Sequence, residues 1–140
     1  NHEGEIDAGS FLIKKHDEEK SSLTFLTMEL DNPTGLGRVV RNKSEKLVKI
    51  VEEKDARLTE KNIKEVNLSC YVFEASFLKN YLRKVKRSII TNEYYLTSLI
   101  DLAIKNNKKI ETVIGKNLVW RGTNTIKELK EAKRLFLQAK

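Results

Sequence analysis

The sequence contains very little of several informative residues: one cysteine, one proline, one methionine and one tryptophan in 140 residues. The single cysteine, Cys70, excludes an internal disulfide and a zinc site built from several cysteines. It is also typical of a reducing compartment, so we expect a cytoplasmic protein. No apolar run approaches the roughly 18 residues of a membrane-spanning helix, and the polar start, Asn1–Glu5, is not a signal-peptide pattern. We therefore expect no membrane partner.

Common catalytic motifs are also missing from the sequence. It has no G-x-x-x-x-G-K-[ST] phosphate loop, no G-x-G-x-x-G fingerprint and no H-E-x-x-H metal site. The only histidines, His2 and His16, lie in or beside the unpatterned N-terminal segment, residues 1–10, which gives no basis for a Ser-His-acid triad.

Positive charge is in excess, with 27 Lys and Arg against 20 Asp and Glu, a net charge of +7. Such a balance indicates an anionic partner, which could be nucleic acid, a phosphorylated small molecule or an acidic surface. The densest basic stretch is Lys79–Arg87. Its neighbouring aromatic residues, Phe77 and Tyr81, share the apolar stripe of a predicted helix, which favours a core role over base stacking. A non-catalytic module that binds nucleic acid or another polyanion remains an alternative.

Apolar periodicity predicts alternating strands and helices, with one β-hairpin inserted, in a single domain. This order indicates an α/β or α+β fold. The run 66–73 alternates as a strand, and we expect Cys70 to be buried on its apolar face. Ser76 is a predicted helix N-cap, and Thr125 with Glu128 forms a predicted capping box. The predicted strands are 23–28, 38–41, 47–51, 66–73 and 109–114, and the last helix is 126–137.

Three local signals could carry chemistry, and each has a plain structural alternative. Gly35–Arg38, with the sequence GLGR, enters a strand, where glycine lets a ligand approach the backbone, or it simply makes a turn. Glu52–Asp55 places three carboxylates after the hairpin, or forms a solvated charge cluster. Asn67 is a polar residue near a strand start, or an ordinary strand-edge asparagine.

Taken in order, five segments resemble the bacterial N-acetylglucosamine-1-phosphate uridyltransferases, members of the sugar-phosphate nucleotidyltransferases. Their order and spacing fit from about Leu12 to Leu137. The resemblance implies an α/β architecture: a partial Rossmann-like nucleotidyltransferase fold, with a mixed sheet, flanking helices and an inserted β-hairpin. The five segments are Asp31–Arg38, Ile50–Ala56, Glu65–Asn67, Glu93–Thr97 and Gly122–Thr125.

The resemblance covers only the second half of that catalytic domain. The family's L-x-x-G-x-G-T-x-M nucleotide loop and G-D-x-P-L segment do not occur in these 140 residues, nor does the β-helix acetyltransferase domain of bifunctional members. Residues 1–10 match nothing in the family, and residues 11–140 correspond to its sugar-binding half. We therefore expect no retained catalytic residue, no activity of the chain alone, and either self-association or a complementing N-terminal half.

The resemblance also implies roles for five residues. Gly37 would offer its backbone to the sugar, Glu52 would accept hydrogen bonds from sugar hydroxyls, and Asn67 would bind the sugar through its amide. Thr97 would lie near the sugar phosphate, at a helix start. Asn124 would supply an oxygen to Mg²⁺. The implied reaction forms UDP-N-acetylglucosamine and pyrophosphate from UTP and N-acetylglucosamine 1-phosphate, for peptidoglycan precursor synthesis.

Several positions depart from the family pattern. Leu36 replaces the usual Tyr, Ser98 a common Asp, and Ile126 an Arg. Leu68 and Ser69 replace the Thr-Gly that follows the asparagine, and they add bulk beside the sugar pocket. A nucleotidyltransferase acting on a different sugar is therefore a further alternative.

Overall fold

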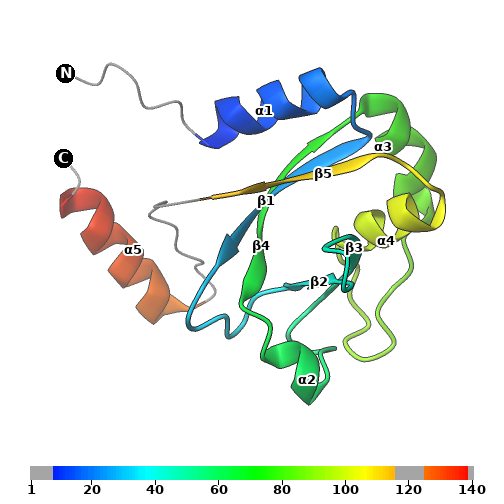
Figure 1. Ribbon diagram of the computed structural model, residues 1–140. Helices are drawn as coiled ribbons and strands as arrows, with labels where there is room; N and C mark the ends of the chain where they lie inside the picture. The colour runs from blue at the N-terminus through cyan, green and yellow to red at the C-terminus, as the bar shows by residue number, and fades with distance from the viewer. Residues whose placement is uncertain (1–7, 116–124, 139–140) are drawn as a thin grey trace, which may run out of the picture.

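A five-stranded sheet with helices on both faces organises the chain, as Figure 1 shows. The computed structural model describes residues 8–115 and 125–138. The elements in chain order are α1 (Ala8–Glu19), β1 (Leu23–Glu29), β2 (Arg38–Arg41), β3 (Leu47–Val51), α2 (Leu58–Lys61), β4 (Glu65–Phe73), α3 (Ala75–Tyr81), a 3₁₀ turn η1 (Leu82–Lys84), α4 (Ser98–Lys105), β5 (Ile110–Ile114) and α5 (Ile126–Gln138).

The sheet is mixed, with strand order β3-β2-β4-β1-β5. Strand β1 lies antiparallel to β4 and parallel to β5, and β2 and β3 form the inserted antiparallel hairpin. This hairpin joins the rest of the sheet where Arg38 pairs with Val66 of β4. The predicted α/β architecture, with its mixed sheet, flanking helices and hairpin, is confirmed.

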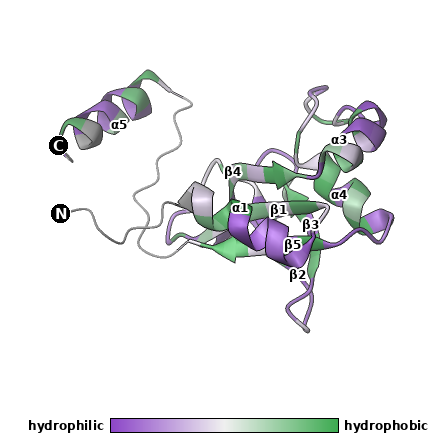
Figure 2. Cartoon of the chain, turned by 90° about the horizontal axis from the view of Figure 1, so that it is seen from above, coloured by the Kyte–Doolittle hydropathy of each residue, from purple (hydrophilic) through white to green (hydrophobic). Residues whose placement is uncertain are grey.

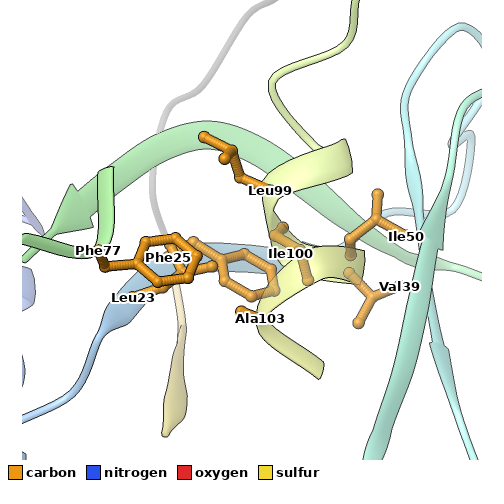
Figure 3. Packing of buried hydrophobic residues seen from close by; sticks show 8 residues of the cluster. All are labelled: Leu23, Phe25, Val39, Ile50, Phe77, Leu99, Ile100 and Ala103. Atoms are coloured by element: carbon orange, nitrogen blue, oxygen red, sulfur yellow. The ribbon is translucent and has the colours of Figure 1, made fainter. Parts of the chain in front are cut away.

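Strand β1 is buried on both faces from Leu23 to Met28, where four apolar residues are interspersed with the small polar residues Thr24 and Thr27. Helix α1 covers one face, where Thr24 Oγ1 lies 2.9 Å from His16 Nδ1. The core on this side comprises Leu12, Leu26, Met28, Val66 and Leu68. On the opposite face α3 and α4 pack over the larger core shown in Figure 3, which comprises Leu23, Phe25, Val39, Ile50, Phe77, Leu99, Ile100 and Ala103.

Aromatic rings form a continuous ladder on the side of α3. Adjacent ring centroids lie 4.8 to 6.3 Å apart along the series Phe25, Tyr71, Phe73, Phe77 and Tyr81. Phe77 lies two residues before the basic stretch Lys79–Arg87, and Tyr81 lies within it. Phe77 is buried in the core and Tyr81 packs against it, with Lys84 Nζ 4.6 Å from its ring centroid, which confirms the predicted core role over a platform for bases.

Two sequence predictions about local structure are wrong, and one is confirmed. Helix α3 begins at Ala75 with Glu74 as its N-cap, so Ser76 lies inside the first turn instead of capping it. Cys70 lies on the predicted face of β4 but is half-buried, because it belongs to the periphery of the core beneath α1. The capping box at the start of α5 is present, with Thr125 Oγ1 accepting from Glu128 N at 3.2 Å.

Hydropathy follows this layered arrangement, as Figure 2 shows. Hydrophobic residues concentrate on the strands, whereas much of α1 is hydrophilic on its outer side. Within residues 8–115 and 125–138, none of the helices has the length and apolar character needed to cross a bilayer.

Candidate functional site

Gly37 lies in the short link that leads into β2, with its backbone against β4. Its carbonyl oxygen accepts a hydrogen bond from the Asn67 N–H at 2.9 Å. A Cβ atom placed on Gly37 would lie 3.3 Å from Ile50 Cγ2 and 3.4 and 3.5 Å from the two carboxylate oxygens of Glu52. The two Glu52 distances are ordinary van der Waals separations and only the Ile50 contact would be tight, so the Glu52 carboxylate lies directly beside the Gly37 backbone.

Glu52 follows β3 and is held in place by a residue far away in the sequence. Its Oε1 accepts a 2.7 Å hydrogen bond from the hydroxyl of Thr97, which is only 7% exposed. Within the part of the chain that the structure describes, Oε2 accepts no hydrogen bond. The carboxylate thus keeps lone pairs that a ligand hydroxyl could use.

Thr97 is the N-cap residue of α4, although its side chain does not cap that helix. The N–H groups of Ser98, Leu99 and Ile100 already donate to carbonyl oxygens three residues earlier, at 3.0 to 3.1 Å. A helix start attracts an anion mainly through unpaired N–H groups. The geometry thus gives Thr97 the task of orienting Glu52, and its nearness to a sugar phosphate remains an expectation from the resemblance.

Asn67 is buried in β4, and its amide is oriented by its own strand. Asn67 Oδ1 accepts from the Ser69 N–H at 3.1 Å, while Nδ2 donates to the Tyr71 hydroxyl. These bonds leave one Nδ2–H and one Oδ1 lone pair of the amide available to a ligand. Asn67 also meets Gly37 through its backbone, so Gly37, Glu52, Asn67 and Thr97 form one continuous chain of contacts.

A bulge in β4 produces the local geometry around Asn67. Thr27 of β1 pairs with Asn67 and Phe25 with Tyr71, so three residues of β4 lie opposite one residue of β1. Ser69 within this bulge has φ +58°, in the left-handed region that favours glycine. A bulge re-aims neighbouring side chains, and here it brings the Asn67 amide to the Tyr71 hydroxyl.

Arg38 is a buried charge that links the residues around this chain of contacts. It is 1% exposed, and its Nη2 lies 2.6 Å from Glu53 Oε2. Its guanidinium also donates to the Leu36 carbonyl and, at 3.3 Å, to a carbonyl of α2. Because Arg38 and Glu53 are the sequence neighbours of Gly37 and Glu52, this ion pair fixes the two loops that carry the candidate site.

A small polar pocket of about 170 Å³ opens beside Glu52 and Thr97. Within it, Ser88 Oγ donates to Asp55 Oδ2 at 3.3 Å. Partial burial raises the pKa of Asp101 to about 6, while a hydrogen bond from the Ile50 N–H opposes the rise. The polar residues that line the pocket are Glu52, Asp55, Lys86, Arg87, Ser88, Tyr95, Thr97, Ser98 and Asp101.

The proposed metal ligand, Asn124, lies outside the described residues. Next to it, Thr125 and Glu128 supply the cap of α5 themselves, with the Thr125 N–H donating to Glu128 Oε2 at 2.8 Å. In the described ranges, no group of three or more His, Cys, Asp or Glu side chains is arranged to hold a metal ion. An amide oxygen suits a hard cation such as Mg²⁺, which commonly takes its remaining ligands from substrate phosphates and water.

Tyr71 was not among the residues singled out from the sequence, and Arg38 was named only as part of the GLGR segment. The two-residue repeat places Asn67, Ser69 and Tyr71 on one face of the strand, but the contact of Tyr71 with Asn67 depends on the bulge and could not be read from that repeat. A buried arginine is rare, and nothing in the sequence indicated the burial of Arg38.

A family model described as "Nucleotidyl transferase" matches residues 7–139. Among curated proteins, the chain is 48% identical to the bifunctional protein GlmU of Carboxydothermus hydrogenoformans over 102 residues, covering 73% of this chain and 23% of that protein. It is 37% identical to GlmU of Legionella pneumophila strain Corby over 126 residues, covering 89% and 27%. The chain thus spans about a quarter of the length of these relatives.

Among solved structures, the fold is similar to a putative glucose-1-phosphate thymidylyltransferase from Bacillus anthracis, crystallised with sucrose. The TM-score is 0.70 and the sequence identity 16%, and the match covers 92% of this chain and 49% of that one. This likeness supports the partial Rossmann-like fold.

Proposed function

Because the chain belongs to the nucleotidyl transferase family, we propose that residues 11–140 are the sugar-binding half of a sugar-1-phosphate nucleotidyltransferase domain. The reaction would form UDP-N-acetylglucosamine and pyrophosphate from UTP and N-acetylglucosamine 1-phosphate. The observation that carries the proposal is the chain of contacts from Thr97 through Glu52 and Gly37 to Asn67. We place the protein in the cytoplasm, in the synthesis of peptidoglycan precursors.

Each residue of this chain of contacts has a role that its surroundings favour. Glu52 accepts hydrogen bonds from sugar hydroxyls, because one carboxylate oxygen is directed by Thr97 and the other is unengaged within the described ranges. Asn67 uses the spare donor and acceptor of its amide, which suits a sugar hydroxyl. Gly37 admits the ligand to the backbone because it has no Cβ.

These residues would contribute to the rate by positioning. The phosphate of the sugar 1-phosphate attacks the α-phosphorus of the nucleoside triphosphate, and pyrophosphate leaves. A sugar held at Glu52 and Asn67 has its phosphate at a fixed place, and such orientation can supply several kcal/mol of the barrier in enzymes of this kind. Asn124 would hold Mg²⁺, which when bound supplies positive charge to the reacting phosphates.

We propose that the 140 residues alone do not turn over, because the sequence contains no L-x-x-G-x-G-T-x-M loop to hold the nucleotide. The test is pyrophosphate release from UTP, N-acetylglucosamine 1-phosphate and Mg²⁺. Release at background rate, together with measurable binding of the sugar phosphate, is the expected result. Robust turnover would refute the claim that essential machinery is missing.

The side of β4 that faces β2 supports the proposal that a complementing half or a second copy of the chain associates here. Strand β4 lies inside the sheet, between β2 and β1, but in the described residues its pairing with β2 consists of the Arg38–Val66 pair beside the hydrogen bond from the Asn67 N–H to the Gly37 carbonyl. Unpaired strand edges readily accept a further strand.

A nucleotidyltransferase for a different sugar is the second candidate function. Ser69 supports it, because a side chain stands beside Asn67 and Tyr71 where the resemblance indicates glycine. Binding of a panel containing N-acetylglucosamine, glucose and galactose 1-phosphates distinguishes the two. Preference for the acetylated sugar favours the first candidate, and preference for glucose or galactose 1-phosphate favours the second.

A further inference from the structure

Tyr71 places a phenolic hydroxyl at the end of the chain of contacts that contains Asn67. The hydroxyl accepts a hydrogen bond from Asn67 Nδ2, and the Ser69 side chain also hydrogen-bonds to it. The ring is fixed between Phe25 and Phe73, whose ring centroids lie 6.2 and 5.6 Å away. The aromatic ladder therefore fixes the ring of Tyr71, and the contacts with Asn67 and Ser69 fix its hydroxyl.

The proton of the Tyr71 hydroxyl is not used by these contacts. An amide NH₂ can only donate, so the oxygen of Tyr71 serves as the acceptor in its bond with Asn67. Burial, the largest influence, raises the pKa of Tyr71 above its usual value of 10.0, and the nearby charge of Glu52 acts in the same direction. The hydrogen bond with Ser69 lowers the pKa of Tyr71, as a bond donated to the phenolic oxygen does, so the Ser69 hydroxyl also acts as a donor here and leaves the phenolic proton free. The hydroxyl is thus a donor at neutral pH.

Donors and acceptors therefore alternate around Asn67. Glu52 can only accept, the Asn67 amide can do both, and the Tyr71 hydroxyl has a proton to donate. Each hydroxyl group of a sugar can both donate and accept a hydrogen bond, and an acetamido group adds a carbonyl oxygen that can only accept. A phenolic donor complements such an oxygen, whereas a half-buried O–H without an acceptor loses free energy.

We propose that Tyr71 is a further binding residue of this site, donating its hydroxyl proton to an acceptor oxygen of the bound sugar. The inference rests on the proposed function. It gives a role in the site to the β4 bulge and its left-handed backbone at Ser69, because the bulge brings the Tyr71 hydroxyl to the Asn67 amide.

The test compares two variants that each remove one hydroxyl from the same aromatic ladder. Tyr71→Phe keeps the ring and its stacking, and Tyr81→Phe is the matched control, because Tyr81 lies at the far end of the ladder. Isothermal titration of the 140-residue chain with N-acetylglucosamine 1-phosphate should show about tenfold weaker binding for Tyr71→Phe. Tyr81→Phe should bind as the parent chain does. Equal affinity of Tyr71→Phe and the parent, or equal losses in both variants, overturns the inference.

A second measurement needs no variant and so does not depend on the folding of Tyr71→Phe. In the parent chain carrying ¹³Cζ-labelled tyrosine, the Tyr71 resonance should shift on titration with the sugar phosphate, while that of Tyr81 stays in place. Binding without a Tyr71 shift overturns this inference alone. Absence of any binding by the parent chain overturns the proposed function, and this inference with it.

Discussion

Thr97 Oγ1 donates a 2.7 Å hydrogen bond to Glu52 Oε1, joining the start of α4 to the end of β3 across 45 positions of sequence. Both residues border the polar pocket beside the larger core. The contact sets the direction of a carboxylate that would otherwise rotate. Glu52 therefore depends on Thr97 for its orientation, and perturbing Thr97 should affect ligand binding more than it affects the fold.

We predict that Thr97→Val weakens binding of N-acetylglucosamine 1-phosphate about tenfold. A hydrogen bond to a charged group contributes about 1.5–3 kcal/mol, and valine preserves the shape of threonine while removing the hydroxyl. Thr97→Ser keeps the donor and should bind within about threefold of the parent. Calorimetric titration measures both, and equal affinity in Thr97→Val and Thr97→Ser would contradict the orienting role.

Ser69→Gly should leave the chain about 1 kcal/mol more stable than Ser69→Ala, because both variants lose the hydroxyl that bonds to Tyr71, whereas only glycine relieves the strain of a Cβ at φ +58°. The Ser69 N–H that donates to Asn67 is a backbone group and remains in the variant. Urea unfolding followed by circular dichroism measures the change. Ser69→Ala is the control, since it removes the hydroxyl but keeps the Cβ. Equal stability of Ser69→Gly and Ser69→Ala would show that backbone strain at this position is not the cause.

Arg38→Met should destabilise the chain by about 3 kcal/mol, because removing the buried guanidinium leaves the Glu53 carboxylate without its counter-charge and two carbonyl oxygens without their donor. Lys64→Met is the control. Lys64 pairs with Asp31 at 3.1 Å, but its side chain is 62% exposed and that of Asp31 is fully exposed, so water can replace the lost interaction. We expect little or no loss there. Similar losses in the two variants would argue against a special role for Arg38.

Asp101→Asn should stabilise the chain at pH 7.5 and have little effect near pH 4. The pKa of Asp101 is about 6 in the folded chain and 3.8 as its ordinary value, so the folded state binds the proton more tightly. Ionisation therefore costs stability as pH rises from about 4 to 6, and the full cost is present above that range. Because the residue is exposed overall, water screening reduces the expected gain to about 1 kcal/mol or less. Thermal melting at both pH values tests this, and equal gains would contradict it.

Much of the fold could be predicted from the sequence, because its elements are specified locally. The alternating run 66–73 gave the correct faces of β4, and the Thr125–Glu128 capping box gave the start of α5. The start of α3 was misplaced by two residues, since a serine near a helix start does not identify which residue is the cap.

The contacts of the candidate site could not be predicted in the same way. The site residues were identified by resemblance, and periodicity does not show that Thr97 meets Glu52, because that contact depends on how α4 packs against β3. The bulge at Ser69 was equally hidden, since serine is not a residue that signals a left-handed backbone. The Tyr71 hydroxyl reaches Asn67 only through that bulge.

The most direct test of the central claim is a ¹H–¹⁵N NMR titration of the 140-residue chain with N-acetylglucosamine 1-phosphate. The account predicts saturable shifts of the Gly37 and Asn67 backbone amides and of the Asn67 side-chain NH₂ group. Amides of the exposed helix α5 should stay unchanged. Shifts confined to the basic stretch Lys79–Arg87, or none at millimolar ligand, would contradict a sugar site formed by Gly37, Glu52, Asn67 and Thr97.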